Sequence, residues 1–265
     1  MPLTGFYDPA TGGPVQVELE QDGAEFRLNR RIAYRDPRHD EPFVVPDDLG
    51  AFRTDLGSVP WFFQWLVPAI GRDLPAVLLH DGLVRATGER RTHLGPLVSR
   101  EEADRIFRDA LAVLGIPRLR RWFIWTAVTA ATAWTALRPR RRWRAVVATT
   151  VGTITVLGVL ATLDFLDVWD VLPWMGARPW PVELLGGLAG AVIVPALLAP
   201  LWRRLWVAGL VLGFALALLL HVTLAVVVTY GVYRVAEAVV SIGDRATNST
   251  RTAGIARDDN GHPGR

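Results

Sequence analysis

The chain has 265 residues, 29 basic and 26 acidic side chains, a formal net charge of +3 and no cysteine. The lack of cysteine excludes disulfides, thiolate metal sites and cysteine nucleophiles. Arginines and acids are nearly balanced in the N-terminal half, with no basic face carrying interleaved aromatics, so we expect no nucleic-acid partner.

The composition divides the chain into two halves. Residues 1–117 mix charges with short apolar runs, whereas 145–233 are nearly free of charge. A span needs about 20 apolar residues to cross the hydrocarbon core. We therefore predict an α+β domain, with a small hairpin or meander plus helices, followed by an all-α bundle. The predicted segments are a cytosolic domain (1–137), a basic linker (138–144), three transmembrane helices (145–163, 182–201 and 205–232) and a polar, disordered tail (234–265).

Basic residues set the expected orientation. The run "RPRRRWR" precedes the first span and "WRRLW" joins the second to the third, while the loop between the first two is acidic. This bias, with no leader-like segment at the start, predicts a multi-pass plasma membrane protein whose N-terminal domain is cytoplasmic. The arginines expected to contact anionic headgroups are Arg138, Arg140, Arg141, Arg142 and Arg144. The tryptophans near span ends, expected as interfacial anchors, are Trp143, Trp169, Trp174, Trp180, Trp202 and Trp206.

Two features of the apolar half bear on its packing. The pairs Gly186/Gly190 and Gly209/Gly213 have the small-xxx-small spacing that lets helices approach closely, within the bundle or in a homo-oligomer. Segment 121–137 is apolar but short and has arginines at both ends. We interpret it as a helix of the domain near the membrane surface, with a fourth span as the alternative.

Strands and then helices are expected in the N-terminal domain. "VQVELEQ" (15–21) and "AEFRLNRRIAY" (24–34) alternate around "DGA" and predict a hairpin, to which "EPFVVP" (41–46) adds a third strand. Ser58 and Pro60 begin a short buried helix that Pro68 ends. A second, largely buried helix is expected around 75–84. A third begins with a Ser99–Glu102 capping box and ends at Gly115.

The second of these helices, "PAVLLHDGLV", contains the pair His80 and Asp81 among apolar residues. A buried imidazole and carboxylate need polar partners. We expect Asp104 at the flank of the next helix, where its carboxylate reaches the boundary of the core. The candidate partners that the chain offers are Thr54, Asp55, Ser58, Arg72 and Asp104.

The motifs "TDLGSVPWFFQWLVP", "GRDLPAVLLHDGLV" and "EEADRIFRDALAVLGIP" resemble, in this order, a small phage and bacterial family catalogued as domain of unknown function 1353. The resemblance covers about residues 15–137. It implies that the family's marked positions are Thr54, Asp55, Ser58, Pro60, His80, Asp81 and Asp104. The chain departs from the family at Gly82, where members tend to carry an aromatic, so we expect open space beside the pair. The resemblance implies no established activity.

Two functional readings remain. In the first, His80, Asp55, Asp81 and Asp104 hold Mg²⁺, Mn²⁺ or Zn²⁺ and activate a water for hydrolysis. A metal-free version has Asp81 or Asp55 orient His80 as a general base toward Ser58 or water. In the second, which we favour, the same residues form a satisfied network in a binding or structural module tethered to the inner membrane face. No Walker loop or dinucleotide fingerprint is present, so we expect no nucleotide cofactor.

Overall fold

The computed structural model describes residues 5–56, 71–84, 92–175 and 178–258. The expected helix that includes Ser58 and Pro60 lies outside these residues. Contacts divide the chain into two units, residues 1–220 and 221–265, and every packing contact described below lies within the first.

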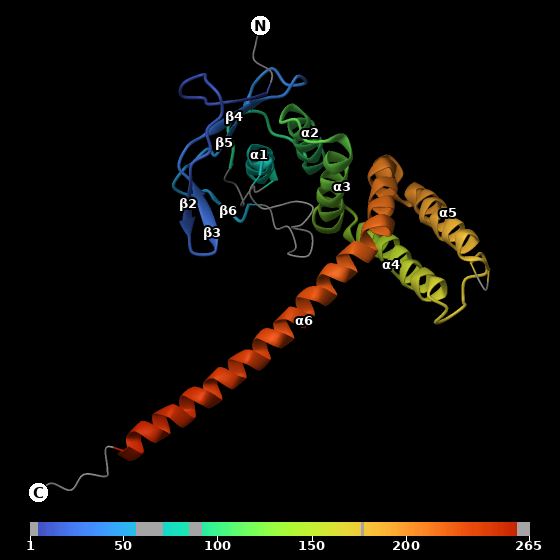
Figure 1. The fold of residues 1–265 in the computed structure, drawn as a ribbon. Helices are drawn as coiled ribbons and strands as arrows, with labels where there is room; N and C mark the ends of the chain where they lie inside the picture. The colour runs from blue at the N-terminus through green and yellow to red at the C-terminus, as the bar shows by residue number, and fades with distance from the viewer. Residues whose placement is uncertain (1–4, 57–70, 85–91, 176–177, 259–265) are drawn as a thin grey trace, which may run out of the picture. The chain divides into compact units, whose positions relative to one another are not determined.

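Among the described residues, six short strands form two antiparallel sheets of three strands each (Figure 1). One sheet has the order β1-β4-β5 and the other β2-β3-β6. The strands are β1 (Gly5–Tyr7), β2 (Leu19–Asp22), β3 (Glu25–Leu28), β4 (Ile32–Arg35), β5 (Phe43–Val45) and β6 (Arg53–Thr54).

The predicted hairpin is confirmed for β2 and β3, which pair with Asp22 opposite Glu25 across a turn that contains Gly23 at φ +67°. Glycine adopts this backbone conformation without the steric cost of a Cβ. The continuous second strand expected over 24–34 is instead divided. Its first part, β3, stays in the hairpin, and its second part, β4, pairs with β1 and β5 in the other sheet. An alternating pattern cannot show that a strand changes sheets, because both parts bury residues in the same core.

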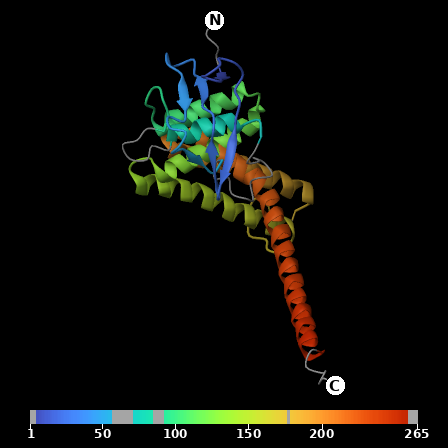
Figure 2. The same ribbon diagram turned by 90° about the vertical axis from the view of Figure 1, so that its left-hand side faces the viewer.

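The described part of the N-terminal domain also contains three helices: α1 (Leu74–Val84), α2 (Arg100–Val113) and α3 (Arg118–Thr135). Helix α1 lies between the strands and α2 (Figure 1), the strands stand in front of the helices in Figure 2, and α1 contacts β4, β5 and α2. The Ser99 Oγ accepts a hydrogen bond from the Glu102 N–H at 3.1 Å, as the capping motif predicts. The core joins both sheets to the three helices, and its fully buried members include Leu28, Ile32, Phe43, Leu78, Leu79, Ile106 and Leu111.

The expectation of open space at Gly82 is wrong. A Cβ built on Gly82 would lie 2.5 Å from a Val45 side-chain atom, closer than carbon atoms can approach. The glycine therefore lets helix α1 pack directly on strand β5, which is the use of glycine at close backbone approaches. Its backbone carbonyl also accepts a hydrogen bond from the Thr92 hydroxyl at 2.6 Å.

The C-terminal half is helical: α4 (Arg140–Phe165), α5 (Trp180–Leu198), the 3-10 segment η2 (Ala199–Leu205) and α6 (Trp206–Asp258). Two stretches, Arg140–Phe165 and Trp180–Ser241, are long and apolar enough to cross a membrane, and the second includes α5, η2 and the first part of α6. Helix α3, which covers most of the segment considered as a possible fourth span, is not among the stretches of the described residues that meet this criterion. It packs against α2 and α4.

Helices α4, α5 and the start of α6 contact one another through small residues. A Cβ on Gly213 would lie 2.6 Å from Pro195 and 3.1 Å from Ile154, and one on Gly209 would lie 2.4 Å from the Trp202 ring. The small-residue spacing is therefore used for packing inside this chain.

One prediction for this half needs correction. Trp143 and Trp202 are not anchors at a water interface; they are 3% and 0% exposed, and the Trp202 indole donates to Thr150 Oγ1 at 2.9 Å. Their rings pack against each other where α4 meets η2. Helix α6 runs to Asp258 and so includes residues 234–258; the disorder expected of the tail stays a prediction. Once an apolar helix is nucleated, adding further residues costs little, and the polar residues after Tyr233 do not include proline before the helix ends.

Candidate functional site

Asp81 faces the strand that precedes the first helix. The Thr54 hydroxyl, at the end of β6, donates to Asp81 Oδ2 at 2.5 Å, and the same oxygen of Thr54 accepts the Leu56 N–H at 3.0 Å. Thr54 is fully buried and Asp81 is 8% exposed. This contact ties helix α1 to the β6 turn across 27 positions of sequence.

His80 faces α2 instead. Its Nε2 lies 2.8 Å from Asp104 Oδ1, and its ring packs on Phe107 with the centroids 4.9 Å apart. Asp104 is only 1% exposed, so it lies within the core and not at the core boundary that its helical position predicts. The imidazole of the neighbouring helix covers it. The second carboxylate oxygen, Oδ2, is buried and has no hydrogen-bond partner among the described residues.

The two members of the pair therefore have separate partners. Successive residues on a helix point about 100° apart, so one side chain reaches β6 while the other reaches α2. Of the other predicted residues, Asp55 is partly buried beside Thr54, Arg72 is exposed before helix α1, and Ser58 lies outside the described residues. The structure thus brings Thr54 to Asp81 and His80 to Asp104.

A second polar cluster was not anticipated from the sequence. Arg105 donates to both oxygens of Asp36, at 3.1 and 2.8 Å, and it also bonds Glu102 and Asp109 on its own helix. His39 Nδ1 lies 2.7 Å from Asp36 Oδ2. Asp36 is completely buried just after β4. The spacing of Glu102, Arg105 and Asp109 on a helix signals their mutual contacts, but nothing local signals a bond to Asp36, 69 positions away.

The charges of this cluster stabilise one another. Burial by itself raises the pKa of the Asp36 carboxyl, but hydrogen bonds from Arg105 and His39 outweigh it and hold that pKa below its usual value. Burial likewise opposes the charge on Arg105, yet its bonds to Asp36 and Glu102 raise its pKa. The nearby Tyr34 hydroxyl has its pKa raised, first by burial and then by the Asp36 and Asp109 carboxylates.

In the described part of the chain, one group of three metal-ligand side chains converges. Ligand atoms of Asp36, His39 and Glu102 all lie within 4.8 Å of one another. The Arg105 guanidinium already bonds both carboxylates of this group, and a cation there would have to displace it. The set predicted from the sequence, His80, Asp55, Asp81 and Asp104, does not form such a group among the described residues.

Comparison with known proteins agrees with the resemblance over the N-terminal domain. Residues 26–128 match the model of a family described as protein of unknown function (DUF1353), which supports assigning this segment to that family. The match begins in β3, contains both polar clusters and ends within α3, before the apolar helices. Searches of curated proteins and of solved structures give no match to the chain.

Proposed function

We propose that the N-terminal domain is a binding or structural module held at the cytoplasmic face of a membrane by helices α4 to α6. The observation that carries the proposal is how the His-Asp pair is used. The Thr54–Asp81 bond joins helix α1 to β6, and the His80–Asp104 bond joins it to α2. Such buried, mutually bonded groups fix the packing of a helix that has no polar face to orient it.

The membrane tether is supported by what the apolar helices expose. Outside the chain's own packing, large side chains of α5 remain uncovered, including Leu185 at 65%, Leu188 at 49% and Leu197 at 72% exposure. A continuous apolar surface of this kind requires lipid or a partner to cover it. Arg140, Arg141 and Arg142 lie in the first turn of α4, the expected place for arginines at the cytoplasmic boundary.

The test uses the full chain in detergent, with His80→Ala, His80→Gln and Thr54→Val variants, followed by thermal melting with and without Mg²⁺, Mn²⁺ or Zn²⁺. The structural role predicts that His80→Ala and Thr54→Val each melt lower than wild type and that no metal raises any of the melting midpoints. A metal that raises the melting midpoint of wild type but not of the variants would contradict the structural role, because a ligand that binds only the folded state stabilises that state.

The tether is tested separately in cells. Alkaline carbonate extraction should leave the chain in the membrane fraction, and reporters fused after 137 and 175 should report cytoplasm and exterior respectively. Release of the chain by carbonate, or the reverse reporter pattern, would overturn the topology.

A metal-assisted or metal-free hydrolase is the second candidate, and one observation favours it. His80 keeps 14% side-chain exposure while its Nε2 is bonded to a buried carboxylate, an arrangement that orients a histidine base. The orienting group in this arrangement is Asp104, in place of Asp81 or Asp55. Hydrolysis of p-nitrophenyl phosphate or acetate by the full chain, abolished in Asp104→Asn without loss of melting temperature, would establish it; equal background rates in both proteins would exclude these reactions.

A further inference from the structure

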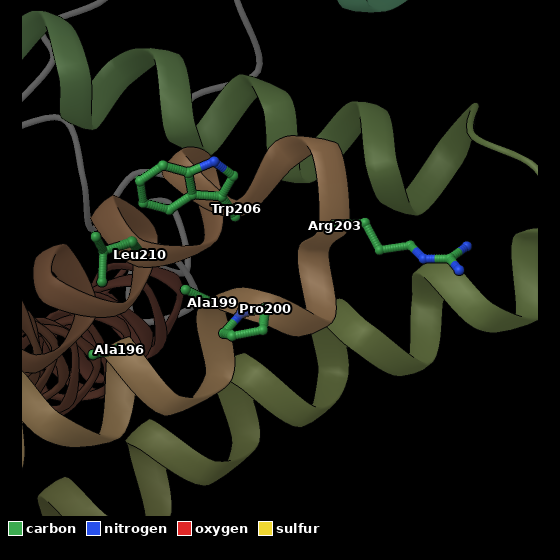
Figure 3. A pocket seen from close by; sticks show the side chains of 6 residues that line it. All are labelled: Ala196, Ala199, Pro200, Arg203, Trp206 and Leu210. Atoms are coloured by element: carbon green, nitrogen blue, oxygen red, sulfur yellow. The ribbon is translucent and has the colours of Figure 1, made fainter.

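A hollow lies where α5, η2 and α6 meet, at the end of the helical region that carries the arginines (Figure 3). Its volume is about 430 Å³, and its lining residues are Ala196, Ala199, Pro200, Arg203, Trp206 and Leu210. All except Arg203 present apolar surface, so the hollow suits a hydrocarbon group.

The charge of Arg203 stands at the edge of this hollow. Figure 3 shows its guanidinium pointing away from Trp206 and Leu210, while Trp206 lies over the apolar side chains. Among the described residues, Arg203 forms no ion pair with a carboxylate; its neighbour Arg204 pairs with Glu101. The edge therefore carries a positive charge that the described part of the chain leaves available to an anion.

Further arginines lie beside it. Arg142 at the start of α4 donates to the Leu201 carbonyl of η2 at 3.0 Å, so the basic first turn of α4 is next to the segment that bears Arg203. Arg142 also lies over the Trp143 ring at 4.8 Å, and Trp143 packs on Trp202. Two basic segments far apart in sequence are thus brought together at one end of the apolar helices.

The backbone at Arg203 has an unusual conformation, with φ 51° and ψ −118°. A side chain with a Cβ adopts such angles only against steric resistance, and glycine would adopt them freely. Backbone strain of this kind is concentrated at ligand-binding and other functional positions. The conformation at Arg203 lets the chain reverse from α5 into α6. A glycine would make this turn without strain, but the chain has an arginine there, at the edge of the hollow.

We infer that this hollow binds one anionic phospholipid of the surrounding bilayer, with part of an acyl chain against Trp206 and Leu210 and the phosphate near Arg203. Basic pockets between transmembrane helices on the cytoplasmic side are suited to anionic headgroups. The inference rests on the proposed membrane tether, because a bilayer is what would present a phosphate and an acyl chain together beside these helices.

The experiment places the full chain in bilayer nanodiscs of phosphatidylcholine with increasing fractions of phosphatidylglycerol, the acyl chains of one lipid at a time being brominated. Bromine quenches nearby tryptophan, and the difference between wild type and Trp206→Phe isolates the signal of Trp206. Brominated phosphatidylglycerol should quench Trp206 at a lower mole fraction than brominated phosphatidylcholine, by roughly five-fold, the effect of about one arginine near an anionic surface.

Three variants separate the parts of the site. Arg203→Gln should remove the preference for phosphatidylglycerol, and Arg38→Gln, an exposed arginine of the N-terminal domain, should leave it unchanged. Ala196→Phe should fill the hollow and abolish Trp206 quenching by both lipids at low fraction, whereas Ala189→Phe, at an exposed alanine of the same helix, should not. Arg203→Gly relieves the backbone strain, so it should lose the lipid preference while keeping or raising the melting temperature.

Equal quenching of Trp206 by the two lipids, in a chain that resists carbonate extraction, would overturn the lipid site and leave the tether intact. A chain released by carbonate would overturn both. Protection from quenching by added inorganic phosphate would show that a free anion is the ligand, and protection that rises with protein concentration would show a second copy of the chain in the hollow; either result would contradict the lipid assignment.

Discussion

The N-terminal domain buries large apolar side chains that helices α4 to α6 leave exposed. In the domain, Leu78, Leu79 and Ile106 are fully buried, whereas Leu185 and Leu197 of α5 are 65% and 72% exposed. Both regions nevertheless pair buried polar side chains inside the chain, His80 with Asp104 in the domain and Trp202 with Thr150 in the helices. The domain supplies its own apolar environment, and the exposure of α5 supports the proposal that the helices take theirs from outside the chain.

The largest effect should come from breaking the buried ion cluster. Arg105→Met leaves the buried Asp36 without its guanidinium partner and should lower the free energy of unfolding by about 3 to 5 kcal/mol. The measurement is denaturant unfolding followed by a signal from the N-terminal domain. Arg27→Met is the control, because its 3.4 Å pair with Asp22 is well exposed and should contribute under about 1 kcal/mol. Similar losses in the two variants would mean that burial does not strengthen the Arg105 contacts.

A charge placed on α5 tests the external apolar environment directly. Leu188→Arg, near the middle of the helix, should make insertion less favourable by about 3 to 4 kcal/mol, from the insertion energies of leucine and arginine. Carbonate extraction and a reporter fused after residue 205, which follows α5, would measure the loss. Val113→Arg, at a 52% exposed position of α2, should change neither. Tolerance of both substitutions would show that water covers α5.

Gly82 and Gly152 give a smaller, opposed pair of effects. Alanine normally stabilises a helix by up to about 1 kcal/mol relative to glycine. Gly82→Ala should instead destabilise the domain by about 1 to 3 kcal/mol, since its Cβ would collide with Val45. Gly152→Ala in α4 meets nothing within 4 Å and should be neutral or stabilising. The measurement is the change in melting temperature of each variant relative to wild type. Changes of the same sign in the two variants would disprove close packing at Gly82.

The polar contact within the helical region should contribute less. Trp202→Phe removes the bond to Thr150 and keeps most of the ring, so a loss of about 1 kcal/mol is expected. Thr150 itself still donates to the Val146 carbonyl. Unfolding in mixed micelles, with Trp169→Phe at a 61% exposed loop position as the control, measures the difference. A larger loss would indicate a cavity left by the indole.

Acid should have the smallest effect near neutrality. The folded pKa of Asp36 lies below its unfolded value of about 3.9, so its stabilisation is complete above that value and is lost as pH falls through the folded pKa. The advantage of wild type over Asp36→Asn should therefore be constant from pH 7 to about 5 and shrink below about 4. An advantage that fell between pH 7 and 6 would contradict a folded pKa of Asp36 below its unfolded value.

The local sequence predicts several elements of the structure. Periodicity, turn residues and hydropathy, which act within a few positions, predict the hairpin, helices α1 and α2, the Ser99 cap and the apolar helices. The need of His80 and Asp81 for polar partners also follows from composition alone, because burying them unpaired is costly.

The choice of partners was decided only by tertiary structure. Three features depend on which elements pack together: β4 leaves the hairpin sheet, His80 buries Asp104, and Gly82 accommodates Val45. The bond from Arg105 to Asp36 depends on the same packing. Likewise, the sequence marks Trp202 and Arg203 as residues of a boundary segment, but the turn of η2 buries one and exposes the other. Sequence fixes which groups need a partner, since that depends on each group's own solvation; geometry across distant segments decides which partner each one meets.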